Sequence, residues 1–325
     1  MGEALWWTAA DAGRETADPS WSEALLDVPA LVIDLRGGEQ VGEAPPLDRA
    51  PCPVIAVVPE NSDSIWPVDL TLPEGSDDIL AAVLAGAAAN PAAAATMAQV
   101  LRATGSLDVL DALRVESLAY SMLLAGPEFR AWLAQRPTRK QPTEEADVVR
   151  TERSGGVLHV ALNRPHVHNA FSAAMRDALA EAFALARTDY SVGTVEVSGN
   201  GPSFCSGGDL SEFGTTDDPV RAHLIRTARS VGAGMHELRD RLTVRVHGAC
   251  IGAGVELPAF ARRVVAAVGT TFRLPEVGMG LIPGAGGTVS LPRRIGRERT
   301  LLLALAGVTL SAEEALDWGL VDAVE

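Results

Sequence analysis

Two glutamates stand in segments that otherwise consist almost entirely of glycine and apolar residues. Glu256 follows the run Gly252-Ala-Gly-Val, and no further acidic residue occurs before Glu276. Glu276 lies in FRLPEVGMGLIPGAGG, residues 272–287, where Arg273 is the only other charged residue. Desolvation raises the pKa of a carboxyl group toward values that are useful in proton transfer. Both glutamates are therefore candidates for acid–base catalysis, and the structural alternative is that each caps a helix or pairs with an arginine.

Two glycine-rich segments lie beside predicted strands or helices. They are FCSGGDL, residues 204–210, and HGACIGAGVEL, residues 247–257. Missing side chains let a ligand approach the backbone, and free amides at a helix N-terminus favour negative charge. Two such amides from separate segments could form an oxyanion hole. The spacing alone is also typical of glycines that only turn the chain.

Other catalytic motifs are not supported. The glycines of residues 252–254 lack the third glycine of a dinucleotide-binding fingerprint, and Pro283 stands where residues 278–280 would need it. No G-x-S-x-G segment indicates a nucleophilic serine. Neither an H-E-x-x-H segment nor clustered cysteines indicate a metal site. We therefore expect no metal and no bound dinucleotide.

The charge balance of the 325 residues limits the classes of partner. Lys plus Arg is 27 against 42 for Asp plus Glu, which gives a formal net charge of −15. A surface this acidic repels nucleic acid and anionic lipid, so we expect neither as the main partner. Lys140 is the only lysine, so an anionic ligand would be bound by arginines and backbone amides.

Cysteine usage and apolar segments favour a cytoplasmic protein. Cys52, Cys205 and Cys250 are too few and too scattered for a disulfide framework, which fits a reducing compartment. The N-terminus lacks the basic and apolar regions of a signal peptide. Residues 79–101 are uncharged, but they are mostly alanine and Asn90-Pro interrupts them, so two soluble helices are predicted rather than a membrane span.

The elements that must position the glutamates alternate between strand and helix after a charged, proline-containing stretch. Apolar runs predict strands, and a Ser-capped segment predicts a helix at residues 172–186. The strands are predicted at residues 157–162, 194–198, 242–247 and 264–268. This alternation is typical of a mostly parallel sheet in an α/β fold. Upstream, strands are predicted at residues 31–35, 54–58 and 68–72, followed by helices within residues 77–133.

An ordered set of segments resembles a known family. Asn163-Arg-Pro with Asn169-Ala is followed by FCSGGDL, GACIGAGVEL and FRLPEVGMGLIPGAGGT. Together they resemble the enoyl-CoA hydratase/isomerase (crotonase) superfamily, and its enoyl-CoA hydratases in particular. The resemblance covers residues 148–325, including LSAEEALDWGLVD near the end. It implies an α/β fold with a crotonase-like ββα spiral core, here with a helical N-terminal region.

The resemblance also implies an active site. The backbone N–H groups of Gly208 and Ala253 occupy the oxyanion-hole positions, and Glu256 and Glu276 occupy those of the water-activating glutamates. Which of the two is the acid and which the base stays open. Further substrate-binding positions are Ser206, Gly207, Asp209, Leu210, Gly252, Gly254, Pro275 and Gly284, although Asp209 is usually structural in the family.

The implied activity is hydration of an enoyl-CoA thioester. Coenzyme A then enters only as part of the acyl-CoA substrate, with no separate cofactor, and a homotrimer or hexamer is expected. Alternatives are an enoyl-CoA isomerase, a CoA-ester hydrolase, a cofactor-free oxygenase, or a non-catalytic acyl-CoA-binding subunit.

The chain departs from the family in its arrangement of helices. Family members usually continue with helices that cover the active site, whereas here similar helical segments stand upstream. We expect a degenerate crotonase-like strand segment at residues 1–76 and a helical cover resembling the family's C-terminal tail at 77–136. A linker at 137–150 and the catalytic core at 151–325 follow. The alternative is an unrelated helical extension.

Overall fold

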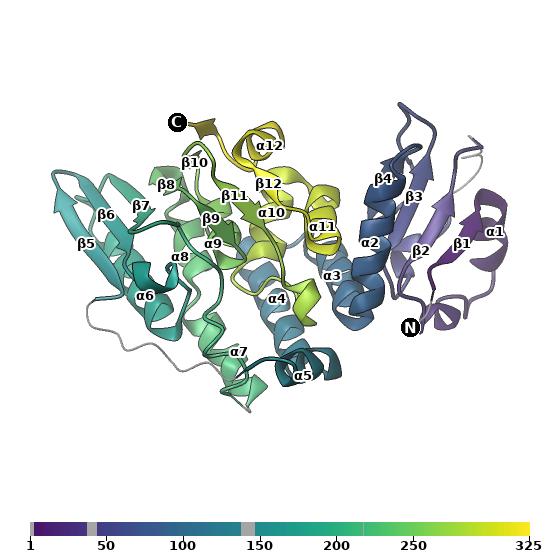
Figure 1. The fold of residues 1–325 in the computed structure, drawn as a ribbon, viewed down its shortest axis with the longest axis horizontal. Coiled ribbons are helices and arrows are strands. Elements are labelled where there is room, and N and C mark those ends of the chain that lie inside the picture. The colour runs from purple at the N-terminus through teal and green to yellow at the C-terminus, as the bar shows by residue number, and fades with distance from the viewer. Residues whose placement is uncertain (1–2, 38–43, 138–146, 217) are drawn as a thin grey trace.

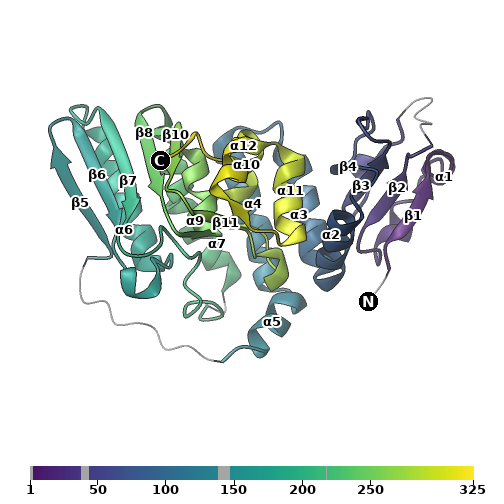
Figure 2. The same ribbon diagram turned by 45° about the horizontal axis from the view of Figure 1, so that its top comes forward.

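The computed structural model describes residues 3–37, 44–137, 147–216 and 218–325. A small sheet formed by the N-terminal residues lies at one end of the molecule, and a larger α/β body lies at the other (Figure 1). Helices α2, α3 and α4 lie between them (Figure 2). Residues 138–146 of the predicted linker lie outside the described residues.

The N-terminal sheet has four parallel strands in the order β1-β2-β3-β4. Alternate side chains face two different clusters: Val32 and Ile55 pack into the main core, whereas Leu31 and Ile33 face a smaller one. Burial of both faces is typical of parallel sheets. The strands and the helix α1 are β1 (Leu5–Thr8), α1 (Ala9–Glu15), β2 (Leu31–Asp34), β3 (Val54–Val58) and β4 (Leu70–Pro73). The interpretation of this region as eroded crotonase-like strands stays a prediction.

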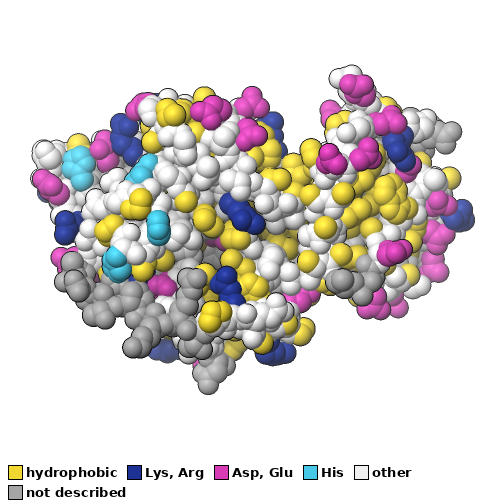
Figure 3. Space-filling model, viewed as in Figure 1, with side chains coloured by type: hydrophobic (Ala, Val, Ile, Leu, Met, Phe, Trp, Pro, Cys, Tyr) yellow, Lys and Arg dark blue, Asp and Glu magenta, His cyan; other side chains and the backbone are white. Residues whose placement is uncertain are grey.

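The helical block, residues 77–136, begins with α2 (Asp77–Ala89) and α3 (Pro91–Thr104). Pro91 opens α3, where its missing N–H costs nothing, and the two helices meet at 110°. No single described helix is long and apolar enough to cross a membrane, and only this bent pair passes such a test jointly. The block continues with α4 (Val109–Leu124) and α5 (Pro127–Ala134). Figure 3 shows hydrophobic side chains gathered over the alanine-rich α2.

The larger body contains a six-stranded sheet in the order β13-β10-β8-β7-β6-β5, parallel except for the β5–β6 pair. A smaller sheet has the order β12-β11-β9. The strands are β5 (Val149–Ser154), β6 (Val157–Leu162), β7 (Thr194–Gly199), β8 (Leu242–Val246), β9 (Ala249–Ile251), β10 (Arg263–Ala266), β11 (Thr271–Arg273), β12 (Leu310–Ser311) and β13 (Ala323–Val324). The helices are α6 (Ala173–Thr188), α7 (Pro219–Ala228), α8 (Val231–Glu237), α9 (Ala253–Glu256), α10 (Gly287–Ile295), α11 (Arg297–Ala306) and α12 (Ala312–Asp317).

The mostly parallel α/β arrangement predicted from the sequence is confirmed. The strand predicted at residues 264–268 ends earlier than expected, at Ala266, because the chain leaves the sheet and Val268 is exposed. Short strands such as β9 and β11 were not predicted, since three residues carry too little periodicity.

Close contacts join the helical block to both ends of the molecule. A Cβ atom at Gly86 on α2 would collide with the carbonyl oxygen of Leu305 on α11, so these helices touch at their backbones. On α3, the Arg102 guanidinium forms a buried ion pair with Asp69 and donates to the Cys52 carbonyl at 2.9 Å. Asp69 in turn accepts from the Val54 N–H at 2.8 Å. The N-terminal sheet is therefore tied to the block by a buried charge pair.

We expect the substitution Arg102→Met to destabilise the protein by about 3–5 kcal/mol, because it leaves the buried Asp69 carboxylate without its cation. The matched control is Arg114→Met on α4, whose exposed pair with Asp111 is worth at most about 1 kcal/mol. Urea unfolding followed by circular dichroism measures both. Equal effects of the two substitutions would contradict the role given to Arg102.

Candidate functional site

A cavity of about 690 Å³, here called the central cavity, lies between the helical block and the larger body. Its walls come from α4, the first turn of α6 with the residues just before it, the segment 206–216, α7, α9 and the segment 273–285. Most of the residues predicted from the sequence line it. They are Ser206, Gly207, Gly208, Leu210, Ala253, Glu256, Pro275, Glu276 and Gly284.

The two glycine-rich segments lie side by side at this cavity. An isolated parallel β-bridge joins the backbones of the free cysteines Cys205 and Cys250. Gly207, with φ of +91°, lies close to the Ile251 carbonyl, where a Cβ atom would come within 3.1 Å of the oxygen. Within the described part of the chain, neither the Gly208 N–H nor the Ala253 N–H donates to a protein acceptor. Both amides are therefore available to an oxygen atom in the cavity.

The Glu276 side chain is half-buried beside Gly252, next to these amides, and its Oε2 atom is buried. Its Oε2 atom has no hydrogen-bond partner among the described residues. A Cβ atom at Gly252 would collide with Oε1, so only glycine at that position lets the carboxylate approach the backbone. Burial raises the pKa of Glu276 to about 7. This carboxyl group can therefore exchange a proton near neutral pH.

Glu256 lies at the C-terminal end of α9 and faces the same cavity. Its Oε2 atom accepts hydrogen bonds from the N–H groups of Ala285 at 2.7 Å and Gly287 at 2.9 Å. Burial raises the pKa of Glu256 well above its usual value, and the nearby Glu276 and Glu116 carboxylates raise it further. The raised pKa values of Glu256 and Glu276 thus disfavour simultaneous ionisation of both carboxyl groups.

Three predicted binding residues do not line the central cavity. The Asp209 carboxylate forms a buried ion pair with Arg164 at 2.9 Å and accepts from the Ser211 hydroxyl at 2.7 Å, so it fixes its own loop. Gly252 makes room for Glu276, as described above. A Cβ atom at Gly254 would collide with the Cys205 carbonyl, so this glycine allows the two segments to pack closely.

Glu116 on α4 was not among the predicted site residues. Its Oε1 atom accepts from the Gly286 N–H at 2.8 Å, and Oε2 accepts from the Thr288 N–H at 2.9 Å and the Thr288 hydroxyl at 2.7 Å. Glu256 takes the two alternate amides, those of residues 285 and 287. The loop 284–288 is therefore held by two carboxylates. A sequence signal existed, since Glu116 falls on the apolar face of α4 with Ala112.

Tyr120 and Leu124, one and two turns after Glu116, line the central cavity. The Tyr120 ring lies against Gly284, where a Cβ atom would come within 2.5 Å of it. Residues of the helical block thus share the cavity with Glu256 and Glu276. That the block replaces helices found elsewhere in relatives stays a prediction.

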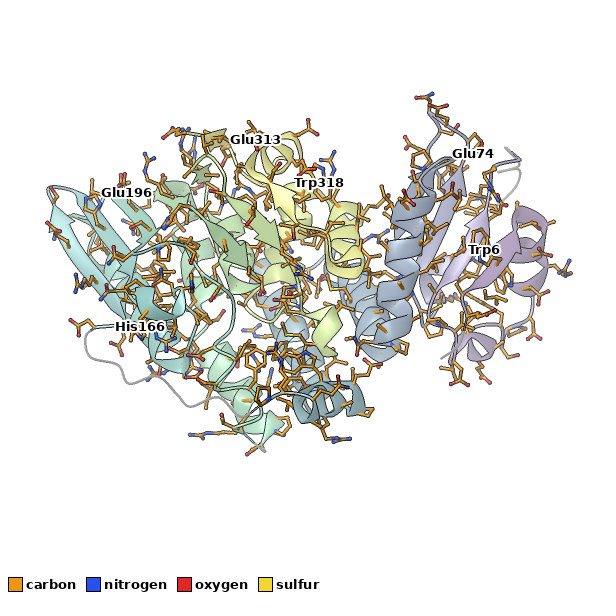
Figure 4. All side chains as sticks on the ribbon, in the orientation of Figure 1. Trp6, Glu74, His166, Glu196, Glu313 and Trp318 are labelled. Atoms are coloured by element: carbon orange, nitrogen blue, oxygen red, sulfur yellow. The ribbon has the colours of Figure 1, made fainter. Side chains whose placement is uncertain are left out.

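Histidines flank the glycine-rich segments without lining the central cavity, within the part of the chain that the structure describes. No group of three His, Cys, Asp or Glu side chains among the described residues could hold a metal ion. His168 bonds the Ser203 hydroxyl and His247 bonds the Gly201 carbonyl, each at 2.9 Å. His166 lies exposed in the loop between β6 and α6 (Figure 4).

Similarity to known proteins covers the larger body. The 2,3-dehydroadipyl-CoA hydratase of Escherichia coli (strain K12) is 35% identical over 168 residues, which cover 52% of this chain and 65% of that protein. The mevalonyl-coenzyme A hydratase SIDH of Beauveria bassiana is 34% identical, over 56% of this chain and 68% of that protein. The chain thus spans slightly less than two thirds of the length of the Escherichia coli relative.

The solved structures agree. The crystal structure of an enoyl-CoA hydratase from Mycobacterium smegmatis superposes with a TM-score of 0.51 at 33% identity, over 55% of this chain and 69% of that chain. An enoyl-CoA hydratase from Thermoplasma volcanium gives 0.51 at 30% identity. The predicted crotonase-like core is therefore confirmed, whereas Glu116 and Tyr120 lie outside the matched part. The sequence profile of the enoyl-CoA hydratase/isomerase family matches residues 152–325, more than half of the chain, and the chain belongs to this family.

Proposed function

We propose that this protein adds water across the 2,3 double bond of an enoyl-CoA thioester. The observation that carries the proposal is the arrangement of the buried Glu256, the half-buried Glu276 and two unbonded backbone amides around one cavity. Family members that lack one of the glutamates tend toward other chemistry, so the presence of both favours hydration over isomerisation.

In the proposed reaction the thioester oxygen accepts hydrogen bonds from the Gly208 and Ala253 N–H groups. These bonds stabilise the enolate character of the transition state, and losing one such donor typically costs about 100- to 1,000-fold in rate. One glutamate carboxylate takes a proton from water while the water oxygen bonds to the β carbon. The other glutamate, as a carboxylic acid, gives a proton to the α carbon. Proton exchange between the pair and solvent restores the starting state.

One glutamate can act as the acid and the other as the base if the pair holds a single proton between them. Glu276 and Glu256 repel each other's ionisation, and both lie in a buried site, so the pair retains a proton near neutral pH. We also propose a homotrimer or hexamer, which the apolar side chains left exposed on α4 and α7 support. These are Leu118, Met122, Val220 and Leu224.

The substitution Glu276→Gln keeps the shape of the side chain and removes its proton exchange. We expect kcat for hydration of crotonyl-CoA and longer 2-enoyl-CoAs to fall about 100- to 10,000-fold, and Glu256→Gln to act similarly. Glu313→Gln, on the exposed surface of α12, is the control (Figure 4). The loss of absorbance of the conjugated thioester measures the rate. If both cavity variants kept full activity, the hydratase proposal would be refuted.

The acid limb of the pH–rate profile should reflect the raised pKa of Glu276. We propose Glu276 as the base, because its pKa is raised less far than that of Glu256. Falling pH then protonates the carboxylate that accepts the proton from water, so kcat/KM should decline about tenfold per pH unit below about pH 7. A glutamate with the usual pKa of 4.5 would instead place the acid limb near pH 4.5. Initial rates between weakly acidic and neutral pH test the point, and a profile that stays flat through the weakly acidic range would argue against it.

Glu116→Gln tests whether the helical block positions the catalytic loop. Glutamine places an N–H₂ group against one of the loop's N–H donors and removes a charge that raises the pKa of Glu256 and Glu276. We expect kcat to fall about tenfold, with a smaller change in KM, and the acid limb to move to lower pH. Reduced activity with an unmoved acid limb would indicate a purely structural role.

A further inference from the structure

Arg226 on α7 points toward α4 at the wall of the central cavity. Its Nη1 atom donates to the hydroxyls of Ser117 at 2.9 Å and Ser121 at 3.1 Å. Among the described residues, no carboxylate lies within ion-pair distance of Arg226, and its Nε and Nη2 atoms have no acceptor. Neutral oxygens of Ser117 and Ser121 therefore hold one edge of the cation, and its Nε and Nη2 donors have no protein partner among the described residues.

Aromatic stacking fixes this cation in place. The Arg226 Cζ atom lies 4.5 Å from the centroid of the Tyr120 ring, a cation–π distance, and that ring lies against Gly284. Arg226 is half-buried, and burial lowers its pKa while the nearby Glu116 carboxylate raises it, although a guanidinium stays protonated in proteins. The Glu116 carboxylate stabilises this charge from beyond ion-pair distance, and no carboxylate among the described residues contacts it directly, so a bound anion would be favourable here.

The other arginines at the central cavity differ from Arg226. Arg176 is already paired with Asp177 at 2.8 Å, whereas Arg221 and Arg273 are exposed to solvent. Arg226 is therefore the partly buried cation that is held in this cavity without a carboxylate partner within the described part of the chain.

The position of Arg226 identifies which part of an acyl-CoA it would meet. Its guanidinium lies over the ring of Tyr120, and that ring contacts Gly284. Ala285, which follows Gly284 in the chain, donates its N–H to the Glu256 carboxylate. The phosphates of coenzyme A are separated from the thioester by the extended pantetheine arm. A cation this close to the glutamates therefore faces the acyl group rather than the phosphates.

We propose that Arg226 binds a carboxylate at the far end of the acyl chain, so that the substrate is the CoA monothioester of an unsaturated dicarboxylic acid. The planar guanidinium presents its free Nε–H and Nη2–H donors as a fork, which matches the two oxygens of a carboxylate. The enoyl part of the substrate rests on the proposed function. Recognition of the carboxylate does not.

Binding of saturated, unreactive thioesters tests this directly. Succinyl-, glutaryl-, adipyl- and suberyl-CoA are each compared by calorimetry with the monocarboxylic acyl-CoA of the same length. We expect at least one dicarboxylic thioester to bind about 10- to 100-fold more tightly than its partner. Arg226→Met should remove this preference and leave binding of the monocarboxylic thioesters unchanged, and Arg226→Lys should restore part of it.

The matched control is Arg229→Met, which removes one charge just after α7. Arg229 pairs with Asp177 at 3.4 Å and does not line the central cavity, so the preference should persist. Equal binding of the two series by the unsubstituted protein at every length would overturn the proposal. So would an equal loss for both series in Arg226→Met, which would make Arg226 a counter-charge for Glu116. A carboxylate preference without hydration would instead refute only the proposed function.

Discussion

The structure of the site depends on how the backbone of loop 284–288 is held. Four successive N–H groups of this loop are bonded alternately, two to Glu256 and two to Glu116. Because a buried amide without a partner is costly, each carboxylate is needed to keep the loop in this conformation. One of them also faces the central cavity, so the loop's backbone bonds orient a group that is placed for chemistry.

The remaining architecture brings the residues of the central cavity together from two sides. Parallel strands and close glycine contacts in the larger body position Glu256 and Glu276 beside the amides of Gly208 and Ala253. The helical block reaches the same place from the other side with Glu116 and, on the next turn of α4, with a tyrosine that supports the neighbouring arginine of α7. Acidic groups and a cation thus line the same cavity, which gives its interior a polarity that a uniformly apolar acyl pocket would lack.

The sequence was sufficient to identify residues that the fold brings together at one cavity where these residues are encoded locally, and their catalytic roles stay predictions. Gly208, Ala253, Glu256 and Glu276 lie in short glycine-rich segments, where the steric need for glycine and the isolation of the acids are visible in the residues themselves. Glu116 could not be assigned in the same way, because its partner amides lie 170 residues or more further along the chain. Its burial on α4 hinted at a polar contact, but only the tertiary packing identifies the loop. Asp209 shows the reverse, since its place in a motif gave no information about the arginine that neutralises it.

The bonding of loop 284–288 by both Glu116 and Glu256 has a thermodynamic consequence. The N–H groups of Gly286 and Thr288 bond Glu116 on α4. These bonds both order the loop and hold α4 against the larger body, so the two processes are coupled. Any ligand that binds better to the ordered loop must therefore strengthen the docking of α4 by the same factor, by reciprocity of linked equilibria. The stability of the contact between the helical block and the larger body therefore depends on whether a ligand occupies the central cavity.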